Sequence, residues 1–260
     1  MVDHHLLRIE IEGHASTVEA LRSVEGGYGH FTAMQVRDRK VRAPDLHLAR
    51  LEEGSQALFG SGVDGEHVRD LIRHALSDDV RDASVRVYIY TAESDVPSVM
   101  VTAREPASKP STPQSLQPAR YQRPLAHIKH LGDFGQTYYG RLATKNGFDG
   151  ALLVSPDGAI AEGSITNIGF AEGDAVVWPD APALHGISMQ VLEQELTKAS
   201  IPWGYRTVNV ADVGTFDGVF ISNARGVAPV GRIDRTILAL GGKLVATVMR
   251  LFDAAPWDPI

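Results

Sequence analysis

The feature that most constrains this chain is a proline-rich segment near its middle. Residues 105–120 include several serines and glutamines together with Pro106, Pro110, Pro113 and Pro118. Proline fixes its own φ and restricts the residue before it, so neither a continuous helix nor a central strand is expected here. A plain surface loop would also fit, but the central position favours a boundary. We therefore predict an interdomain linker over residues 105–122, between domains of residues 1–104 and 123–260.

The hydrophobic pattern predicts mixed helices and strands on both sides of this linker. Before it, we expect strands at 7–11, 31–36, 85–90 and 99–102 and helices at 44–58 and 66–76. After it, we expect helices at 133–146, 187–199 and 243–252 and short strands at 150–154, 160–162, 167–171, 175–178 and 219–222. The fold class is therefore α/β or α+β, in two halves.

Composition excludes several classes of function. The chain has 260 residues with a formal net charge of −7, so non-specific binding to nucleic acid or to an anionic membrane surface is not expected. It contains no cysteine, which excludes disulfides, cysteine-ligated zinc and a thiolate nucleophile. We find neither a signal peptide nor an apolar run of membrane-spanning length. A small-molecule partner is the remaining expectation.

Three residues stand in settings that suit a cofactor. Lys129 is an isolated lysine in an apolar stretch, Glu162 stands beside a glycine at a predicted strand end, and Gly186 precedes a predicted helix. A desolvated lysine amine can form a Schiff base, and a helix start can bind phosphate. A carboxylate can hold the proton of a pyridinium ring. Each signal alone is typical of an ordinary surface residue, but together they suggest pyridoxal 5′-phosphate (PLP).

Other catalytic chemistries lack their patterns. The ten histidines show no spacing typical of metal ligands, so we expect no metal site. No Gly-x-Ser-x-Gly motif is present, and Gly163-Ser164 lacks the context of a serine hydrolase.

Five segments in order carry a family resemblance: His47–Leu51 (HLARL), Ile128–Leu131 (IKHL), Glu162–Phe170 (EGSITNIGF), Leu184–Ser188 (LHGIS) and Val219–Ala224 (VFISNA) with Pro229 and Val230 after it. They resemble the class IV aminotransferases, a family that includes branched-chain and D-amino-acid aminotransferases and aminodeoxychorismate lyase. The 33 positions from Lys129 to Glu162 also fit the family. The resemblance implies PLP fold type IV, with a smaller N-terminal α/β domain and a larger C-terminal mixed, β-barrel-like domain with helices.

The resemblance also implies a role for each matched residue. Lys129 would form the Schiff base and then carry the proton between the substrate Cα and the cofactor C4′. Glu162 would pair with the pyridine nitrogen, so that the ring acts as an electron sink. Arg50 would hold the phosphate through its donor fork. Further cofactor contacts are implied for Asn167, Gly186, Ile187, Ser188, Asn223 and Ala224.

The substrate pocket is assigned to residues of the first half. Tyr28 and Phe31 match pocket positions, and alternation along a strand puts Arg86 and Tyr88 on one face. The candidates for gripping a substrate carboxylate are Arg86, Tyr88, Arg37 and Arg123.

The sequence departs from the family pattern at three places. Phe134 stands where branched-chain enzymes have a tyrosine, so a hydroxyl partner for the cofactor ring would come from elsewhere, such as Tyr138. His185 replaces the usual proline before Gly186, and the loop from Ser222 to Val230 is about one residue short and carries Arg225.

These observations support one main hypothesis and two alternatives. The main one is a PLP-dependent aminotransferase that moves an amino group between an amino acid or amine and a 2-oxo acid. The alternatives are a lyase of the aminodeoxychorismate type, which eliminates pyruvate, and a non-catalytic PLP-binding homologue. The resemblance implies a homodimer, and we expect a cytoplasmic location.

Overall fold

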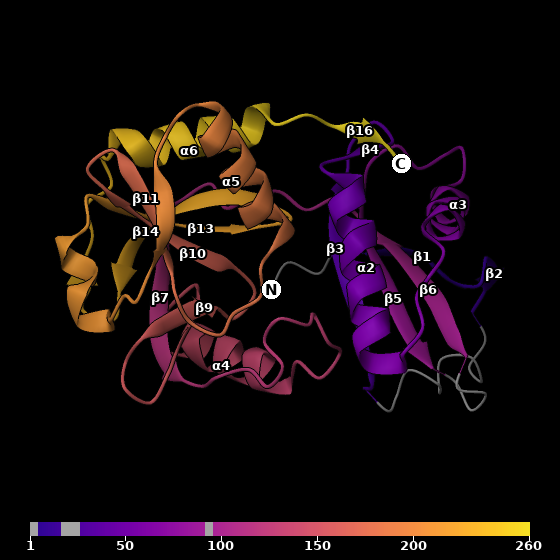
Figure 1. Ribbon diagram of the computed structural model, residues 1–260, viewed down its shortest axis with the longest axis horizontal. Coiled ribbons are helices and arrows are strands. Elements are labelled where there is room, and N and C mark those ends of the chain that lie inside the picture. The colour runs from indigo at the N-terminus through magenta and orange to yellow at the C-terminus, as the bar shows by residue number, and fades with distance from the viewer. Residues whose placement is uncertain (1–4, 17–26, 92–95) are drawn as a thin grey trace. The chain divides into compact units, whose positions relative to one another are not determined.

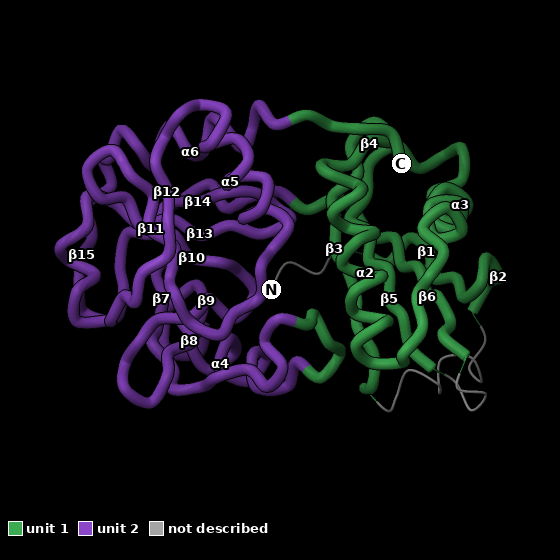
Figure 2. Tube along the Cα trace, in the orientation of Figure 1, with its two compact units in different colours: residues 1–107, 128–132, 256–260 green, residues 108–127, 133–255 purple. Residues whose placement is uncertain are grey.

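The computed structural model describes residues 5–16, 27–91 and 96–260. These residues form two compact units, which Figure 2 colours separately. Unit 1 contains residues up to 107 together with 128–132 and 256–260, and unit 2 contains residues 108–127 and 133–255. Two short segments that follow residue 107 in the sequence therefore also belong to unit 1. No helix among the described residues is long and apolar enough to span a membrane.

Unit 1 is built on an antiparallel sheet of five strands in the order β2-β1-β6-β5-β3. The strands are β1 (Leu6–Ile11), β2 (His14–Ala15), β3 (Gly29–Val36), β5 (Ala83–Thr91) and β6 (Pro97–Arg104). Helices α2 (Pro44–Phe59) and α3 (Gly65–Leu76) pack against this sheet (Figure 1). A separate two-stranded ladder joins β4 (Lys40–Val41) to β16 (Asp258–Pro259).

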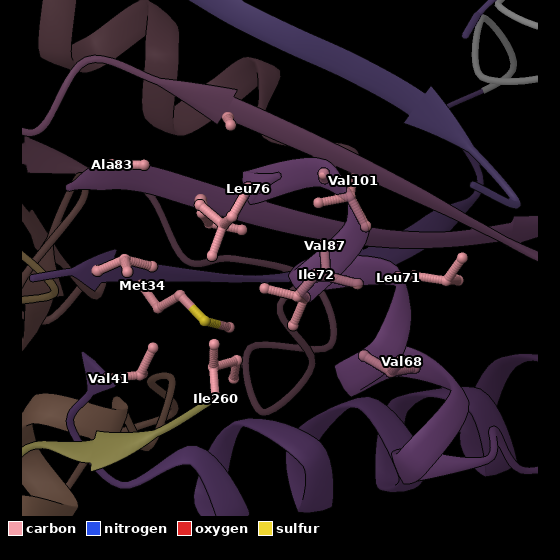
Figure 3. Packing of buried hydrophobic residues seen from close by; sticks show 14 of the residues in the cluster. Met34, Val41, Val68, Leu71, Ile72, Leu76, Ala83, Val87, Val101 and Ile260 are labelled. Carbon is pink, nitrogen blue, oxygen red and sulfur yellow. The ribbon is translucent and has the colours of Figure 1, made fainter. Parts of the chain in front are cut away.

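The core of unit 1 follows from the alternation of its strands. Every second residue of β5 is buried, from Ala83 to Ile89, and these side chains meet the apolar face of α3. Figure 3 shows Ile72, Leu76 and Val87 in this cluster, with Ile260 packed beside Val41 and Met34. Because Ile260 is 8% exposed, residues 256–260 contribute directly to this core.

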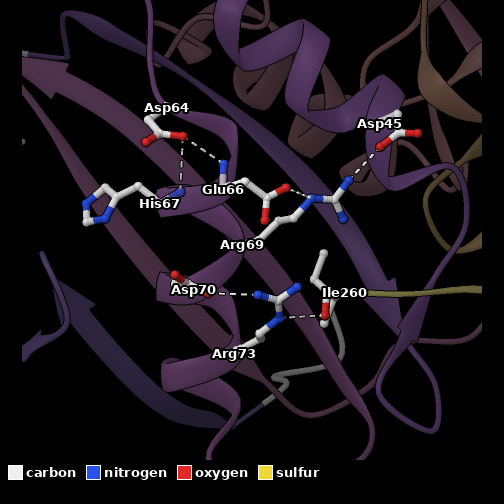
Figure 4. A network of polar contacts seen from close by, with 8 residues as sticks. All are labelled: Asp45, Asp64, Glu66, His67, Arg69, Asp70, Arg73 and Ile260. Atoms are coloured by element: carbon white, nitrogen blue, oxygen red, sulfur yellow. Dashed lines mark hydrogen bonds and ion pairs between the residues drawn. The ribbon is translucent and has the colours of Figure 1, made fainter.

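Polar contacts fix both α3 and the segment that pairs with β4. The Asp64 carboxylate accepts hydrogen bonds from the backbone N–H groups of Glu66 and His67, which caps α3 at its first turn. On the same helix, Arg73 Nε donates to the backbone oxygen of Ile260 at 2.8 Å, and Arg73 Nη1 also reaches Asp70 (Figure 4). The helix thereby holds residues 256–260 in place.

Unit 2 is built on a mixed sheet of nine strands. The order is β12-β11-β10-β13-β14-β7-β8-β9, with β15 paired to β14. The sheet curls so that β9 at its edge also lies against β10 and β11, which confirms the expected barrel-like domain. The strands are β7 (Gln114–Arg120), β8 (Gly150–Val154), β9 (Ile160–Gly163), β10 (Asn167–Glu172), β11 (Ala175–Pro179), β12 (Trp203–Arg206), β13 (Gly218–Asn223), β14 (Gly226–Ile233) and β15 (Thr236–Ile237).

Helices cover parts of this sheet. Helix α4 (Phe134–Lys145) packs on β7 and β8, α5 (Ile187–Lys198) packs on β13, and α6 (Lys243–Ala254) packs on β13, β14 and α5. A 3-10 helix, η1 (Val210–Thr215), precedes β13. Buried apolar side chains such as Phe170, Val219 and Val230 form the core of the unit.

The expectation that residues 105–120 contain no central strand is wrong for β7, which pairs in parallel with β14 on one side and β8 on the other. The prediction from the prolines failed because β14 pairs only with the first half of β7, up to Leu116. In the second half, Pro118 is in register with Leu152 of β8, and no pairing to β14 is present. Proline is tolerated in a strand that has one open edge, because its missing N–H then leaves no gap in a ladder.

Candidate active site

Lys129 belongs to unit 1 because its segment extends the sheet beyond β3. The backbone N–H of Phe31 donates to the Lys129 oxygen at 2.9 Å, and the N–H of Leu131 donates to the Gly29 oxygen at 2.8 Å. His30 and His130 face each other as an antiparallel bridge. This pairing places a residue from the middle of the sequence on the edge of a sheet made by the first 104 residues.

Three of the predicted pocket residues form a group in which Phe31 contacts the Lys129 side chain. Lys129 Nζ lies 4.6 Å from the centre of the Phe31 ring, and that ring stacks on Tyr88 with centroids 5.5 Å apart. Arg86 places its guanidinium carbon 5.8 Å from the same ring and donates from Nη1 to the Tyr88 hydroxyl at 3.4 Å. The grouping follows from the register, because Phe31 is opposite Tyr88 and Ala33 is opposite Arg86 in the β3–β5 ladder.

Buried polar groups support this site from the helix side of β3. The Thr32 hydroxyl and His47 Nδ1 are 2.6 Å apart, and His30 Nε2 lies 2.9 Å from the Ser55 hydroxyl. Burial lowers the pKa of His47 from the ordinary 6.5 to about 3, helped by the positive charges of Arg50 and Lys129. Burial also lowers the pKa of His30 to about 4. Both imidazoles are therefore neutral near pH 7.

Arg50 is half-buried on α2, three residues after His47. Its charge and that of Lys129 both act on the His47 ring, so unit 1 brings the two predicted cofactor residues near one buried neutral group.

Two other first-half candidates make contacts with neighbouring segments of unit 1. Tyr28 is 59% exposed, donates its hydroxyl to the Leu58 oxygen and packs on Phe59. Arg37 donates from Nη1 to the Val36 oxygen and from Nη2 to the Ala107 oxygen. Its guanidinium thus binds two backbone oxygens, and the roles of Tyr28 and Arg37 toward a substrate stay predictions.

Glu162 lies on β9 in unit 2 and is 5% exposed. Its Oε1 accepts a hydrogen bond from Arg123 Nη1 at 3.1 Å, and its Oε2 accepts one from the backbone N–H of Leu184 at 3.3 Å. Arg123, which is also 5% exposed, donates to the Ala126 oxygen as well. Arg123 is therefore the charge partner of Glu162, and its role as a grip for a substrate carboxylate stays a prediction.

The turn before α5 is shaped by two of the residues predicted to contact the cofactor, Asn167 and Gly186. Asn167 Nδ2 donates to the Leu184 oxygen at 2.6 Å. A Cβ on Gly186 would lie 2.0 Å from Asn167 Oδ1, so only glycine fits at this position. Gly186 is the N-cap residue of α5 and provides no side-chain cap. The backbone N–H groups of Ile187 and Ser188 in the first turn thus keep the donors that suit an anion.

The loop between β13 and β14 is stabilised from within. Asn223 Oδ1 accepts from the backbone N–H of Arg225 at 2.9 Å, and Asn223 Nδ2 donates to the Ile165 oxygen at 3.4 Å. Ala224 lies in the turn that this arrangement closes. In the structure, Asn223 therefore supports the loop, and its contact with a cofactor stays a prediction.

The aromatic residues at the start of α4 are exposed. Phe134 is 81% exposed and stacks on Tyr138, which is itself 52% exposed. Nearby on the same helix, Gln136 Nε2 donates to the Ser164 oxygen at 3.5 Å. No contact ties either aromatic ring to Glu162 within the described part of unit 2, so a cofactor role for Tyr138 stays a prediction.

A sequence comparison identifies the family, and structure comparisons show the fold. The family model for class IV aminotransferases matches residues 29–233. A hypothetical aminotransferase from Mycobacterium tuberculosis in a PLP-bound form is similar, at 20% identity and TM-score 0.80 with 90% of each chain covered. A putative 4-amino-4-deoxychorismate lyase from Legionella pneumophila is 17% identical at TM-score 0.82, covering 90% of this chain and 93% of that one.

A branched-chain amino acid aminotransferase from Escherichia coli has the same fold. It is 17% identical at TM-score 0.81, with 96% of this chain and 95% of that chain covered. No curated protein matches the sequence. Since the family model covers most of the sequence, the chain belongs to the class IV aminotransferase family, whose members use PLP.

Proposed function

We propose that the chain is an aminotransferase that moves an amino group from an amino acid or amine to a 2-oxo acid. The observation that carries this proposal is the Lys129 amine against the Phe31 ring, which in turn contacts Arg86 and Tyr88. A primary amine in such a half-buried aromatic setting suits attachment to an aldehyde. One similar structure is described as bound to α-ketoglutarate, which supports a 2-oxo acid as acceptor.

The residues of each unit fit PLP by chemistry. Unit 1 would supply Lys129 for the aldehyde and Arg50 for the phosphate. Unit 2 would supply Glu162 for the pyridine nitrogen and the uncapped start of α5 for the phosphate. When bound, PLP supplies an electron sink for the carbanion formed at the substrate Cα. Contacts of Asn167, Asn223 and Ala224 with the cofactor belong to the same proposal.

Each of these side chains then has a defined task. The Lys129 amine takes the proton from the substrate Cα and returns it at C4′. The Arg123 guanidinium at 3.1 Å favours the ionised form of Glu162, and a carboxylate is what keeps a ring nitrogen protonated. Arg86 and the Tyr88 hydroxyl offer a paired site for a substrate carboxylate, and Phe31 offers an apolar wall.

The test is covalent trapping on a chosen lysine. Borohydride reduction of the protein with PLP should fix the cofactor on Lys129, as read by peptide mass, and Lys129→Ala should abolish the trapping. Amino transfer should fall by at least about 10³-fold in that variant. The matched control is Lys145→Ala in the last turn of α4, which should trap PLP normally. Trapping on another lysine in the wild type would contradict the proposal.

A lyase of the aminodeoxychorismate type is a second candidate, since the Legionella pneumophila neighbour has that description. The same Lys129 and Glu162 would serve it. A panel of L- and D-amino acids and chiral amines, read by cofactor absorbance, should show amination of the cofactor for a transaminase. Release of pyruvate from aminodeoxychorismate without a transferred amine would favour the lyase.

Assembly and location complete the proposal. Family membership supports a homodimer, which sedimentation equilibrium should report as twice the 28.1 kDa mass of the chain. A monomer with full activity would contradict it. We also propose a cytoplasmic location, to be checked by fractionation.

A further inference from the structure

Helix α5 carries a buried acidic residue that the proposed chemistry does not use. Glu193 is 7% exposed, although its neighbours on the inner face of the helix, among them Leu192 and Leu196, are apolar. Its Oε1 accepts a hydrogen bond from the Tyr205 hydroxyl at 2.6 Å, and its Oε2 lies 2.7 Å from His185 Nε2. Both carboxylate oxygens thus have a partner.

The partner of Oε2 stands in the turn that precedes α5. His185 directly precedes Gly186, the N-cap residue whose following N–H groups face the expected phosphate. The backbone of the same turn is held by three other side chains. Glu162 accepts from the Leu184 N–H, Asn167 donates to the Leu184 oxygen, and Gln190 donates to the His185 oxygen at 3.0 Å. Glu193 is therefore the anchor of the His185 side chain, the most exposed side chain of this turn.

A carboxylate buried in this way needs a reason. Removing a charge from water is costly, and an apolar residue of similar size would pack on this face of α5 without that cost. Such groups are in some proteins retained because they fix one conformation among several. The second contact of Glu193 supports this reading, since the Tyr205 hydroxyl of β12 donates to the other carboxylate oxygen and so fixes the carboxylate from a second element.

The position of His185 indicates that the backbone just before Gly186 is what the Glu193 contact restrains. The residue before Gly186 is His185, at a place where a proline would restrict the backbone by itself. Histidine does not, so a side-chain anchor can supply the missing restriction.

We propose that Glu193, acting through His185, is a positioning residue that holds the turn 184–186 in the form that binds the PLP phosphate. The inference rests on the proposed function, because it takes PLP as the ligand of the first turn of α5. Glu193 itself touches no cofactor in this proposal. Its effect is on the conformation of the turn before the ligand arrives.

The first experiment compares two ligands that differ only in the phosphate. Glu193→Leu removes both hydrogen bonds and suits the apolar surroundings. PLP affinity, measured by absorbance titration, should fall about tenfold, while pyridoxal affinity stays within twofold of the wild type. Glu193→Gln should lose less, because the amide keeps the shape and one acceptor. The matched control is Glu195→Leu on the same helix, whose carboxylate pairs with Lys198 and which should leave both affinities unchanged.

The second experiment is a double-mutant cycle with His185→Pro. If the anchor replaces proline, Glu193→Leu should weaken PLP binding in the wild-type background and change it less than twofold in the His185→Pro background. Tyr205→Phe provides a milder variant, with a PLP-specific loss of about threefold, should Glu193→Leu fail to fold. NMR of the apoprotein should show altered backbone signals for residues 184–186 in Glu193→Leu and not in Glu195→Leu.

The outcomes separate this inference from the proposed function. Unchanged PLP affinity in Glu193→Leu, or an equal loss for PLP and pyridoxal, would overturn the positioning role while leaving PLP chemistry in place. A wild-type protein that binds pyridoxal and PLP equally would overturn the phosphate assignment of the turn. A wild-type protein that binds neither would remove the proposed function itself.

Discussion

The two units support their candidate site residues in opposite ways. In unit 1, neutral hydrogen-bonded groups lie behind the charged ones, as in the Thr32–His47 and His30–Ser55 pairs. In unit 2, the supporting groups are themselves charged and buried, as in the Arg123–Glu162 pair. A neutral hydrogen-bonded pair is destabilised when one of its groups is protonated. A buried ion pair is destabilised when either partner is removed. The comparison therefore predicts different weaknesses in the two units.

The largest effect is expected from breaking the ionic support. Arg123→Met leaves the Glu162 carboxylate buried beside an apolar side chain, so the free energy of unfolding should fall by about 3–5 kcal/mol. Urea unfolding followed by the fluorescence of the buried Trp178 would measure this in unit 2. The double variant Arg123→Met with Glu162→Met should recover most of the loss. A loss under about 1 kcal/mol in the single variant would remove the contrast between the units.

The next effect is acid sensitivity of the neutral support. The pKa of His47 is about 3 in the folded chain and 6.5 when unfolded, so the unfolded state binds more protons below pH 6.5. Stability is thus fully present above pH 6.5 and is lost as the pH falls towards 3. Between pH 8 and pH 5 the wild type should lose about 2 kcal/mol more than His47→Gln, as read by urea unfolding at each pH.

The control for this prediction is His67→Gln, which removes an exposed histidine of α3 that pairs with Glu12. It should lose stability in acid just as the wild type does. Equal losses in His47→Gln and the wild type would mean that His47 is not the source of the acid sensitivity.

The smallest effect is expected from removing one neutral hydrogen bond. Thr32→Val leaves His47 Nδ1 without its hydroxyl partner and should cost about 1–2 kcal/mol of unfolding free energy. Thr102→Val is the matched control, because the Thr102 hydroxyl on β6 is buried and has no hydrogen-bond partner among the described residues. That change should be neutral or slightly stabilising in the same urea experiment. Similar costs for both variants would show that only packing matters here.

Local patterns in the sequence predicted the helices and strands well, because each pattern depends only on the residues of its own segment. The spacing of apolar residues located α2 and α3, and the punctuated short runs located β8 to β11. The same alternation placed Arg86 and Tyr88 on one face, next to Phe31. In each of these cases, residues that are neighbours in sequence determine the local structure.

Long-range pairing was not predicted from the sequence, because it depends on residues that are far apart in the chain. Nothing in residues 128–132 indicates that they pair with β3, and β7 was missed because its prolines were judged without its neighbours. The Arg123–Glu162 pair joins residues 39 positions apart, and neither has a local signal for the other. Glu193 would have been found only by asking why a helix with an apolar inner face carries an acid there.

The contribution of residues 256–260 to unit 1 has a consequence for biosynthesis. Ile260 packs in the core made by the first 104 residues, and β16 pairs with β4. A ribosome that has finished residue 107 must still translate residues 108–255, which at about 5–20 residues per second takes about 7 to 30 seconds. During that interval the emerging first unit lacks the Ile260 side chain and β16, so it is more exposed to chaperones and proteases than the completed unit.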